Sequence, residues 1–202
     1  MLKVLTKGCE PTKGSKYSAA VDLYASEDIV IGAGETKIIG LGVAIDLDKL
    51  KETVPDYKKI CKYYENAISK RQLTKIKATE TKDYLINEKL NIFKKTHYLE
   101  LHPRSSLAAK GLIFNIGIID LDYKDEIKAI IHNPLKDVTH EEIHLESGES
   151  YKHTYSLPYE VKKGNRIAQI LLKEHRSYLF DIKTDKERIG GFGSTGKCDA
   201  TR

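Results

Sequence analysis

Short runs of β-branched and aromatic residues, separated by glycine and other turn-forming residues, recur along most of the chain. Residues 29–47, IVIGAGETKIIGLGVAIDL, contain such runs divided by glycines, and the pattern returns in GLIFNIGIIDLDY (111–123) and EIKAIIHNP (126–134). Runs of about four to eight apolar or alternating residues bounded by turn residues are typical of strands. The pattern predicts an all-β fold of the sandwich or jelly-roll type.

Residues 49–96 interrupt this pattern with a helical periodicity. Apolar residues recur here at steps of three and four, which places them on one face of a helix. They are Val54, Tyr57, Ile60, Tyr64 and Ala67 in a first stretch, and Ile86, Leu90 and Phe93 in a second. The sequence therefore predicts a helical hairpin inserted into a single domain that spans residues 1–202.

The positive charge of the chain is concentrated in the same segment. Residues 49–96 hold 13 Lys or Arg and 6 Asp or Glu, a net of +7, which leaves 5 − 7 = −2 for the rest of the chain. A charged run on a helix is usually a solvated face. We therefore expect a basic helix pair that packs on its own barrel, and no nucleic-acid partner.

The chain is expected to be soluble and cytoplasmic, in a host cytoplasm if its origin is phage or viral. No apolar run reaches the roughly 18–20 residues of a membrane span, and the N-terminus, MLKVLTKGCEPTKG, lacks the apolar core of a signal peptide. Its three cysteines, Cys9, Cys61 and Cys198, are odd in number and lack the spacing of metal ligands. That usage fits a reducing compartment.

The C-terminal stretch GGFGSTGK, residues 190–197, has the spacing of a Walker A phosphate loop but departs from it. From Gly191 the pattern G-x-x-x-x-G-K matches, yet Cys198 stands where the loop needs Ser or Thr for Mg²⁺. Such a loop also opens a long helix, and only residues 198–202 follow here. The stretch needs another explanation.

Polar residues on an apolar or glycine-rich background form five ordered stretches. They are SAAVDLYA (18–25), HPRSSLAAKG (102–111), GIIDLDYKDE (117–126), KKGNRIAQILL (162–172) and RIGGFGSTG (188–196). Each alone is common in β proteins, because a strand aspartate, a hydroxyl-rich loop or a basic turn is usually structural. Their joint occurrence in this order carries the information.

In this order the five stretches resemble the five motifs of the trimeric dUTP nucleotidohydrolases, or dUTPases. The resemblance covers most of the chain outside residues 49–96, which fall between the first and second motifs. It implies a distorted jelly-roll β-barrel that assembles as a homotrimer. It also implies a mobile C-terminal arm over residues 186–202.

The resemblance implies Mg²⁺-dependent hydrolysis of dUTP to dUMP and pyrophosphate, which limits uracil in DNA and supplies dUMP for thymidylate synthesis. Asp120 fits the family aspartate that activates a water for in-line attack on the α-phosphate. Mg²⁺ prefers oxygen ligands and keeps several waters. It would therefore be held mainly by the triphosphate, with Asp22 contacting it through a water.

Phosphate contacts are implied for residues of three motifs. Arg104, Ser105 and Ser106 fit the second motif, and Gln169 fits the fourth, where it reaches the phosphates from a neighbouring subunit. In the arm, the implied contacts to the β- and γ-phosphates are Arg188, Gly193, Ser194 and Thr195. Each active site would therefore take residues from three chains.

The nucleoside is implied to lie against the main chain around Asp120. For the uracil pocket we select Asn115, Ile118, Ile119 and Lys128. Tyr123 fits the tyrosine that packs beneath the sugar and leaves no room for a 2′-hydroxyl, and Phe192 would stack on uracil. Backbone groups arranged for uracil would be left unpaired against cytosine, which is a strong source of discrimination.

Two positions depart from the family pattern. Asp125 stands where glycine is usual, so an aspartate would have to form a turn that favours positive φ. The spacing from Arg188 to Phe192 is one residue shorter than usual, so Lys186 could share the γ-phosphate role.

Two alternatives stay open at this point. One is a dCTP deaminase or a bifunctional relative, which shares the fold and a motif like RSSLA but lacks the GGFGSTG arm. The other is a dUTPase with an additional regulatory role, in which residues 49–96 bind a protein partner.

Overall fold

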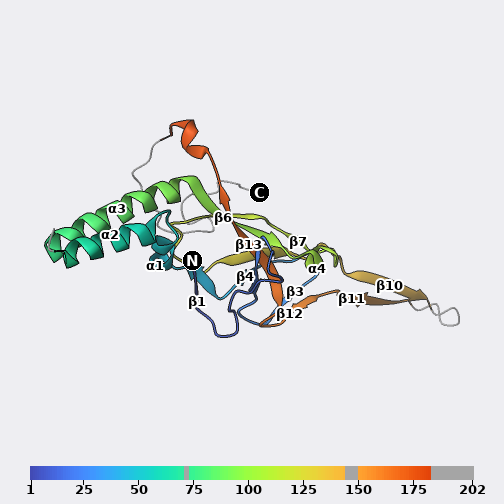
Figure 1. Ribbon diagram of the computed structural model, residues 1–202. Coiled ribbons are helices and arrows are strands. Elements are labelled where there is room, and N and C mark those ends of the chain that lie inside the picture. The colour runs from blue at the N-terminus through green and yellow to red at the C-terminus, as the bar shows by residue number, and fades with distance from the viewer. Residues whose placement is uncertain (71–72, 144–149, 183–202) are drawn as a thin grey trace.

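The computed structural model describes residues 1–70, 73–143 and 150–182, and strands dominate these ranges. A β body lies at the centre, a helical hairpin projects from one side of it, and a two-stranded hairpin projects from the opposite side (Figure 1). The strands are β1 Leu2–Val4, β2 Val21–Tyr24, β3 Ile29–Ile31, β4 Thr36–Gly40, β5 Val43–Ile45, β6 His97–Pro103, β7 Ile113–Phe114, β8 Gly117–Asp120, β9 Lys128–His132, β10 Val138–Ile143, β11 Ser150–Tyr155, β12 Tyr159–Val161 and β13 Arg166–Glu174. The predicted mostly-β architecture is confirmed.

The body is organised around a four-stranded antiparallel sheet in the order β2-β13-β6-β8. A three-stranded sheet, β4-β9-β7, and the pairs β1-β5 and β3-β12 complete it, while β10-β11 is the projecting hairpin. Alternate residues of a strand face opposite sides of a sheet. In β6, Leu99 and Leu101 accordingly enter the core, whereas Tyr98, Glu100 and His102 face outward.

The helices are α1 Leu47–Glu52, α2 Tyr57–Ser69, α3 Lys75–Thr96 and α4 Ser105–Ala108, with a 3₁₀ turn, η1, at Ser177–Phe180. The helical segment thus begins at Leu47, just before the predicted start at residue 49. Its second long helix begins at Lys75, earlier than the apolar pattern suggested. Both starts are explained by capping, because Asp46 accepts a hydrogen bond from the Lys49 N–H at 3.1 Å and Thr74 accepts one from the Lys77 N–H at 3.3 Å.

The helical segment shares the hydrophobic core of the β body. Leu50 and Val54 near α1 and Leu90 of α3 are buried in the same cluster as the strand residues Leu23 and Ile39. Burying a leucine side chain contributes about 1.5–3 kcal/mol. The segment is therefore built into the fold, although much of α2 and α3 projects into solvent (Figure 1).

Two findings concern the helices and the cysteines of the described residues. Within them, no helix has the length and apolar character needed to cross a membrane. Cys9 is fully buried, with its Sγ 3.6 Å from the Ala25 carbonyl oxygen, and burial raises the pKa of this thiol. Cys61 is half-buried on α2, and Cys198 lies outside the described ranges.

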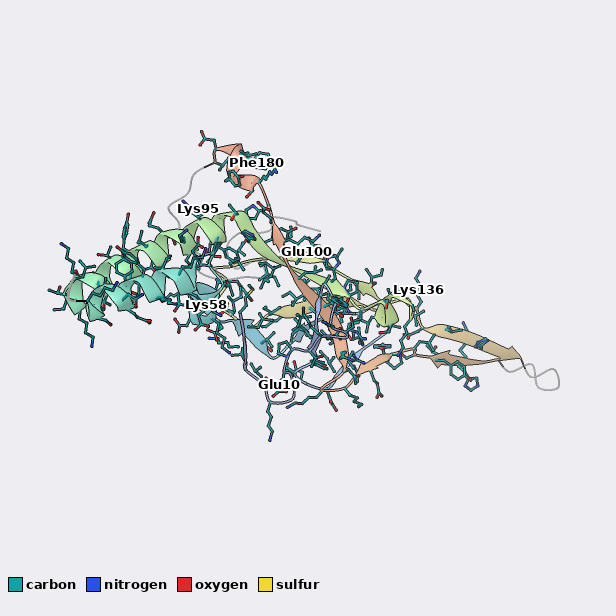
Figure 2. The ribbon with its side chains drawn as sticks, viewed as in Figure 1. Glu10, Lys58, Lys95, Glu100, Lys136 and Phe180 are labelled. Carbon is teal, nitrogen blue, oxygen red and sulfur yellow. The ribbon has the colours of Figure 1, made fainter. Side chains whose placement is uncertain are left out.

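A carboxylate network occupies the outward face of the four-stranded sheet. Glu100 accepts hydrogen bonds from the Tyr98 hydroxyl at 2.7 Å and from the His102 ring, and Lys173 lies 3.1 Å from its Oε1. Hydrogen bonds from Tyr98, His102 and Lys173 lower the pKa of Glu100 to about 2. Glu100 lies in the middle of the body, away from Lys58 and Lys95 of the helical hairpin (Figure 2).

This network predicts a pH-dependent contribution to stability. The folded pKa of Glu100 lies below its ordinary value of 4.5, so the contribution is full above that pH and is lost as the pH falls toward 2. Glu100→Gln should lower the midpoint of thermal unfolding by a few degrees at pH 7, and the gap to wild type should narrow below about pH 4.5 and close near pH 2. Glu174→Gln, at the exposed end of β13, is the matched control. A gap that stays constant from pH 7 to pH 3 would contradict the assignment.

Candidate active site

Residues from three of the five motifs meet around the carboxylate of Asp22. Arg104 Nε lies 3.3 Å from Asp22 Oδ1, Gln169 Nε2 donates to the same oxygen at 3.1 Å, and Arg166 Nη1 donates to Oδ2 at 3.4 Å. Asp22 is only 3% exposed, and a buried charge is retained when it is paired and hydrogen-bonded. We call these four residues the Asp22 cluster.

The sheet register explains why these residues meet. In the ladders of β13, Gln169 lies opposite Asp22 of β2 on one side and opposite His102 of β6 on the other. Arg104 follows the end of β6, beside the start of β13. A register shift between Arg166 and Ala168 marks a bulge in β13 at this point, and bulges commonly re-aim side chains.

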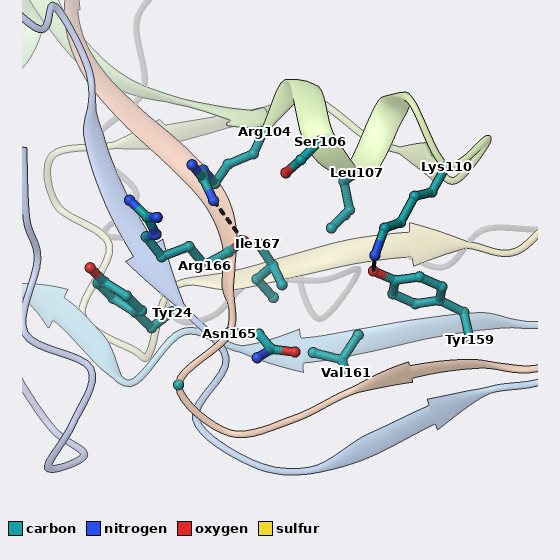
Figure 3. Close-up of a pocket in the computed structure, with 11 residues that line it drawn as sticks. Tyr24, Arg104, Ser106, Leu107, Lys110, Tyr159, Val161, Asn165, Arg166 and Ile167 are labelled. Atoms are coloured by element: carbon teal, nitrogen blue, oxygen red, sulfur yellow. Dashed lines mark hydrogen bonds between the residues drawn. The ribbon is translucent and has the colours of Figure 1, made fainter. Parts of the chain in front are cut away.

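A pocket of about 400 Å³ adjoins the Asp22 cluster (Figure 3). Its lining includes both arginines of the cluster, Ser106 and Lys110 around α4, and Tyr159 at its far end. Ser105, the first residue of α4, is exposed beside it. The candidate phosphate contacts Arg104 and Ser106 therefore line one cavity. Gln169 does not line it, but is connected to Arg104 because both side chains contact Asp22.

The Nε atom of Arg104 makes no hydrogen bond within the Asp22 cluster. Its Nε is buried and has no hydrogen-bond partner among the described residues, although it is 3.3 Å from Asp22 Oδ1. Its Nη1 donates to the Arg166 carbonyl oxygen at 3.5 Å. Arginine offers five N–H donors in a fixed fork that suits phosphate oxygens, so this side chain is positioned for an anion beside Asp22.

Asp120 lies far from the Asp22 cluster within the same chain. Asp120 is the last residue of β8 and pairs with Tyr98 of β6. Asp22 of β2 pairs with Gln169 of β13, and Gln169 pairs with His102, which lies four residues after Tyr98 on β6. Strands rise about 3.3 Å per residue and lie about 4.8 Å apart. The two aspartates are therefore separated by roughly 13 Å along the strands and roughly 14 Å across the three spacings from β8 to β2, which is roughly 20 Å in all. A single chain therefore does not bring Asp120 to a phosphate held beside Asp22.

The loop after Asp120 is anchored to the body by Glu126. Glu126 Oε1 accepts a hydrogen bond from the Gly42 N–H at 2.7 Å, and Tyr123 donates from its hydroxyl to the Glu126 carbonyl oxygen at 3.2 Å. Tyr123 is buried as part of the core. Apart from glycines, only Asp56 and Asp181 among the described residues have positive φ. Asp125 therefore forms its turn without the left-handed conformation expected for it.

The residues selected for the uracil pocket lie on β7 to β9 and their connections. The Asn115 N–H donates to the Ile130 carbonyl oxygen at 3.0 Å, so that backbone group holds the strands together. Ile118 is 71% exposed, Ile119 packs partly against the core, and Lys128 is exposed at the start of β9. Ile118 and Ile119 share β8, an edge strand of the four-stranded sheet, with Asp120, and none of the four selected residues belongs to the Asp22 cluster.

The arm residues Lys186, Arg188, Phe192, Gly193, Ser194 and Thr195 lie outside the described residues.

The single carboxylate beside the pocket suits a metal ion that enters already bound to the phosphates of a substrate. Asp22 is the single carboxylate of the cluster, and over the described ranges no three His, Cys, Asp or Glu side chains are grouped to hold a metal. Mg²⁺ commonly binds through one carboxylate plus substrate phosphates and waters. Asp22 fits that mode as one anchor.

Sequence reasoning missed Arg166 and Lys110 as site residues. Arg166 belongs to the stretch that contains Gln169, and it pairs with Asp22 only because of the bulge in β13. Lys110 belongs to the stretch that contains Arg104 and follows Ser106 by four residues. That spacing could have indicated a shared side of the α4 turn.

The fold and the site define a mostly-β protein with a cationic pocket beside its central sheet. A family model described as dUTPase matches residues 68–149. The chain is 28% identical over 196 residues to a deoxyuridine 5'-triphosphate nucleotidohydrolase of Candida glabrata, with 94% of this chain and 90% of the relative covered. A protein of the same name from Nautilia profundicola is 27% identical, with 93% and 90% covered.

Solved structures of phage dUTPases share the fold of this chain. The Staphylococcus bacteriophage 80alpha dUTPase with dUPNHPP matches with a TM-score of 0.54 at 21% identity, and 98% of each chain is covered. The dUTPase from phage phi11 of S. aureus matches with a TM-score of 0.51 at 16% identity, with 96% of this chain and 97% of that chain covered. The predicted jelly-roll fold is confirmed. Together the family model and these relatives support the dUTPase family for this chain.

Proposed function

We propose that this protein hydrolyses dUTP to dUMP and pyrophosphate. The observation that carries the proposal is the Asp22 cluster, because three motifs of the dUTPase family converge there beside a cationic pocket. Pyrophosphate release measured with dUTP, dTTP, dCTP and UTP tests it. Release from dUTP alone is the expected result, and consumption of dCTP with release of ammonia would instead indicate a deaminase.

Asp120 is the proposed general base. Its carboxylate takes a proton from a water that attacks the α-phosphate in line, which expels pyrophosphate and leaves dUMP. An exposed carboxylate at the end of β8 is open to solvent water and to a substrate carried by another chain. Holding the water in line with the scissile bond supplies much of the rate, and proton removal supplies more.

The Asp22 cluster is the proposed triphosphate site. Arg104 and Arg166 together carry one more positive charge than Asp22 neutralises, and Ser106 adds a hydroxyl donor. Mg²⁺ entering with the triphosphate would offset phosphate charge, with Asp22 as its water-mediated anchor. Gln169 holds the Asp22 carboxylate in place at 3.1 Å and would contact the phosphates from the same position.

Selection of deoxyuridine is assigned to the segment around Asp120. Main-chain groups from Asn115 to Ile119 and near Lys128 would read uracil, and the Tyr123 ring would lie beneath the sugar. Tyr123 is held by its hydrogen bond to the Glu126 carbonyl oxygen, which fixes the ring position. A rigid wall at that position disfavours a 2′-hydroxyl because accommodating it would require the core to move.

A homotrimer with shared active sites accounts for the distance between the two halves of the site. Asp120 and the Asp22 cluster are complementary in the proposed reaction, yet they lie roughly 20 Å apart in one chain by the strand spacings. Exposed apolar side chains at Ile113, Ile116 and Ile118 adjoin the Asp120 half. Burying them against a neighbouring chain would remove apolar surface from water.

The arm is proposed to close over bound substrate from a third chain. A truncation that ends at Arg188 should leave a folded trimer, with kcat/KM for dUTP reduced by about a hundredfold or more, because several phosphate contacts and the Phe192 ring are lost together. Gel filtration and steady-state kinetics check the two halves of this expectation. A truncated protein with normal turnover would remove the arm from the mechanism.

Two further expectations stay predictions. A cytoplasmic location suits an enzyme of nucleotide supply, and a protein partner for residues 49–96 would occupy the exposed faces of α2 and α3. For the second, the core positions of Leu50, Val54 and Leu90 favour an architectural role of the segment over a purely accessory one.

A further inference from the structure

The pocket beside the Asp22 cluster is lined partly by residues that have no role in the proposed reaction so far, among them Lys110 and Tyr159. Its lining contains three cationic side chains, Arg104, Arg166 and Lys110, and no carboxylate. Arg104 and Arg166 stand at the end that touches Asp22, and Lys110 stands at the other end against Tyr159 (Figure 3). A cavity with cations at both ends and no lining anion is suited to an extended polyanion.

Lys110 is held in position before any ligand arrives. Its Nζ donates to the Tyr159 hydroxyl at 3.2 Å and lies 5.1 Å from the centroid of the Tyr159 ring. An ammonium group carries three donors, and Tyr159 takes one of them. A lysine side chain normally loses rotamer freedom when it binds a phosphate, and the tyrosine reduces that loss because it already restricts the chain.

The pocket is continuous with the proposed triphosphate site. Arg104 and Arg166 line the pocket and also pair with Asp22 at 3.3 and 3.4 Å, so a ligand beside Asp22 has its next phosphates within the cavity. The apolar floor of Leu107, Val161 and Ile167 offers no acceptor from a side chain that would compete for the cations. The volume of about 400 Å³ leaves room for phosphate groups and bridging waters.

We infer that Lys110, positioned by Tyr159, binds the terminal phosphate of the nucleoside triphosphate and, after reaction, the pyrophosphate product. This inference rests on the proposed function, since it assigns a subsite of the same reaction. It gives the substrate a γ-phosphate contact within the described body of the protein.

The test measures binding of inorganic pyrophosphate with Mg²⁺ to the full chain by calorimetry, with dUMP as the second ligand. Lys110→Met should weaken pyrophosphate binding about tenfold, the loss expected for one charge-assisted hydrogen bond, and leave dUMP binding within about twofold. Lys110→Arg should recover binding to within about threefold of wild type. Lys58→Met, on exposed α2 away from the pocket, is the matched control and should change neither ligand (Figure 2).

Tyr159→Phe separates positioning from folding. It keeps the ring and removes the hydroxyl, so pyrophosphate binding should weaken about threefold with an unchanged unfolding midpoint. Wild-type affinity in Lys110→Met, or equal loss of pyrophosphate and dUMP binding, would overturn the inference. A wild-type protein that binds pyrophosphate through Lys110 but fails to hydrolyse dUTP would reject the proposed function and leave the pocket assignment standing.

Discussion

Replacing Asp120 with asparagine should lower kcat for dUTP hydrolysis by about a thousandfold while dUTP binding stays within about threefold of wild type. The amide keeps the size and polarity of the side chain but does not accept a proton from water at neutral pH. Binding should persist because the proposed phosphate contacts are made by the Asp22 cluster and the pocket, and not by the Asp120 side chain. Single-turnover kinetics together with titration of a non-hydrolysable analogue separates the two effects.

Asp125→Asn provides the matched control for this experiment. Asp125 is an exposed aspartate in the same turn, it has no assigned role in the reaction, and its backbone is outside the left-handed region. Its replacement should leave kcat within about threefold. A near-normal rate in Asp120→Asn would reject this residue as the base, and loss of binding in that variant would place it in the substrate contacts.

Mixed trimers of two inactive chains should recover activity. Arg104→Gln is expected to cripple the triphosphate site, and Asp120→Asn the base, so each homotrimer alone should be nearly inactive. If each active site takes its base and its Asp22 cluster from different chains, about a quarter of the sites in randomly mixed trimers contain both intact halves, since each half is intact with a probability of one half.

Co-expression of the two chains with different affinity tags, followed by tandem purification, isolates these mixed trimers. Because this purification removes both homotrimers, and one of the three sites in each mixed trimer combines both intact halves, recovery of roughly a third of wild-type kcat per site is the expected outcome. A preparation of mixed trimers as inactive as its parents would show that both halves of the site must come from one chain. A mixture of wild-type and Asp120→Asn chains calibrates the dilution, because its activity should scale with the wild-type fraction.

Much of the site could be predicted from sequence because its residues sit in ordered motifs. Asp22, Arg104 and Gln169 were expected to serve one ligand, and in the structure the Arg104 and Gln169 side chains lie 3.3 and 3.1 Å from Oδ1 of Asp22. Period-two alternation also predicts which residues of β6 face the core. These features depend on local spacing, which a sequence contains directly.

Other features depend on pairings that local spacing does not contain. Arg166 reaches Asp22 through a bulge in β13, and Lys110 meets Tyr159 across 49 residues of sequence. The early start of α3 depends on the Thr74 cap and not on apolar periodicity. The network on Glu100 joins β6 to Lys173 of β13. It could not be predicted from the sequence because it depends on the pairing of these two distant strands.

The shared core also limits how this chain can change over evolutionary time. Leu50, Val54 and Leu90 reach the interior from the helical segment and share one buried cluster with residues of the strands. A single deletion of the segment would leave cavities that cost about 2–5 kcal/mol for each large apolar side chain removed. Once such a segment has been accommodated, its loss requires compensating substitutions in the barrel, so descent should retain it even where its outer surface diverges freely.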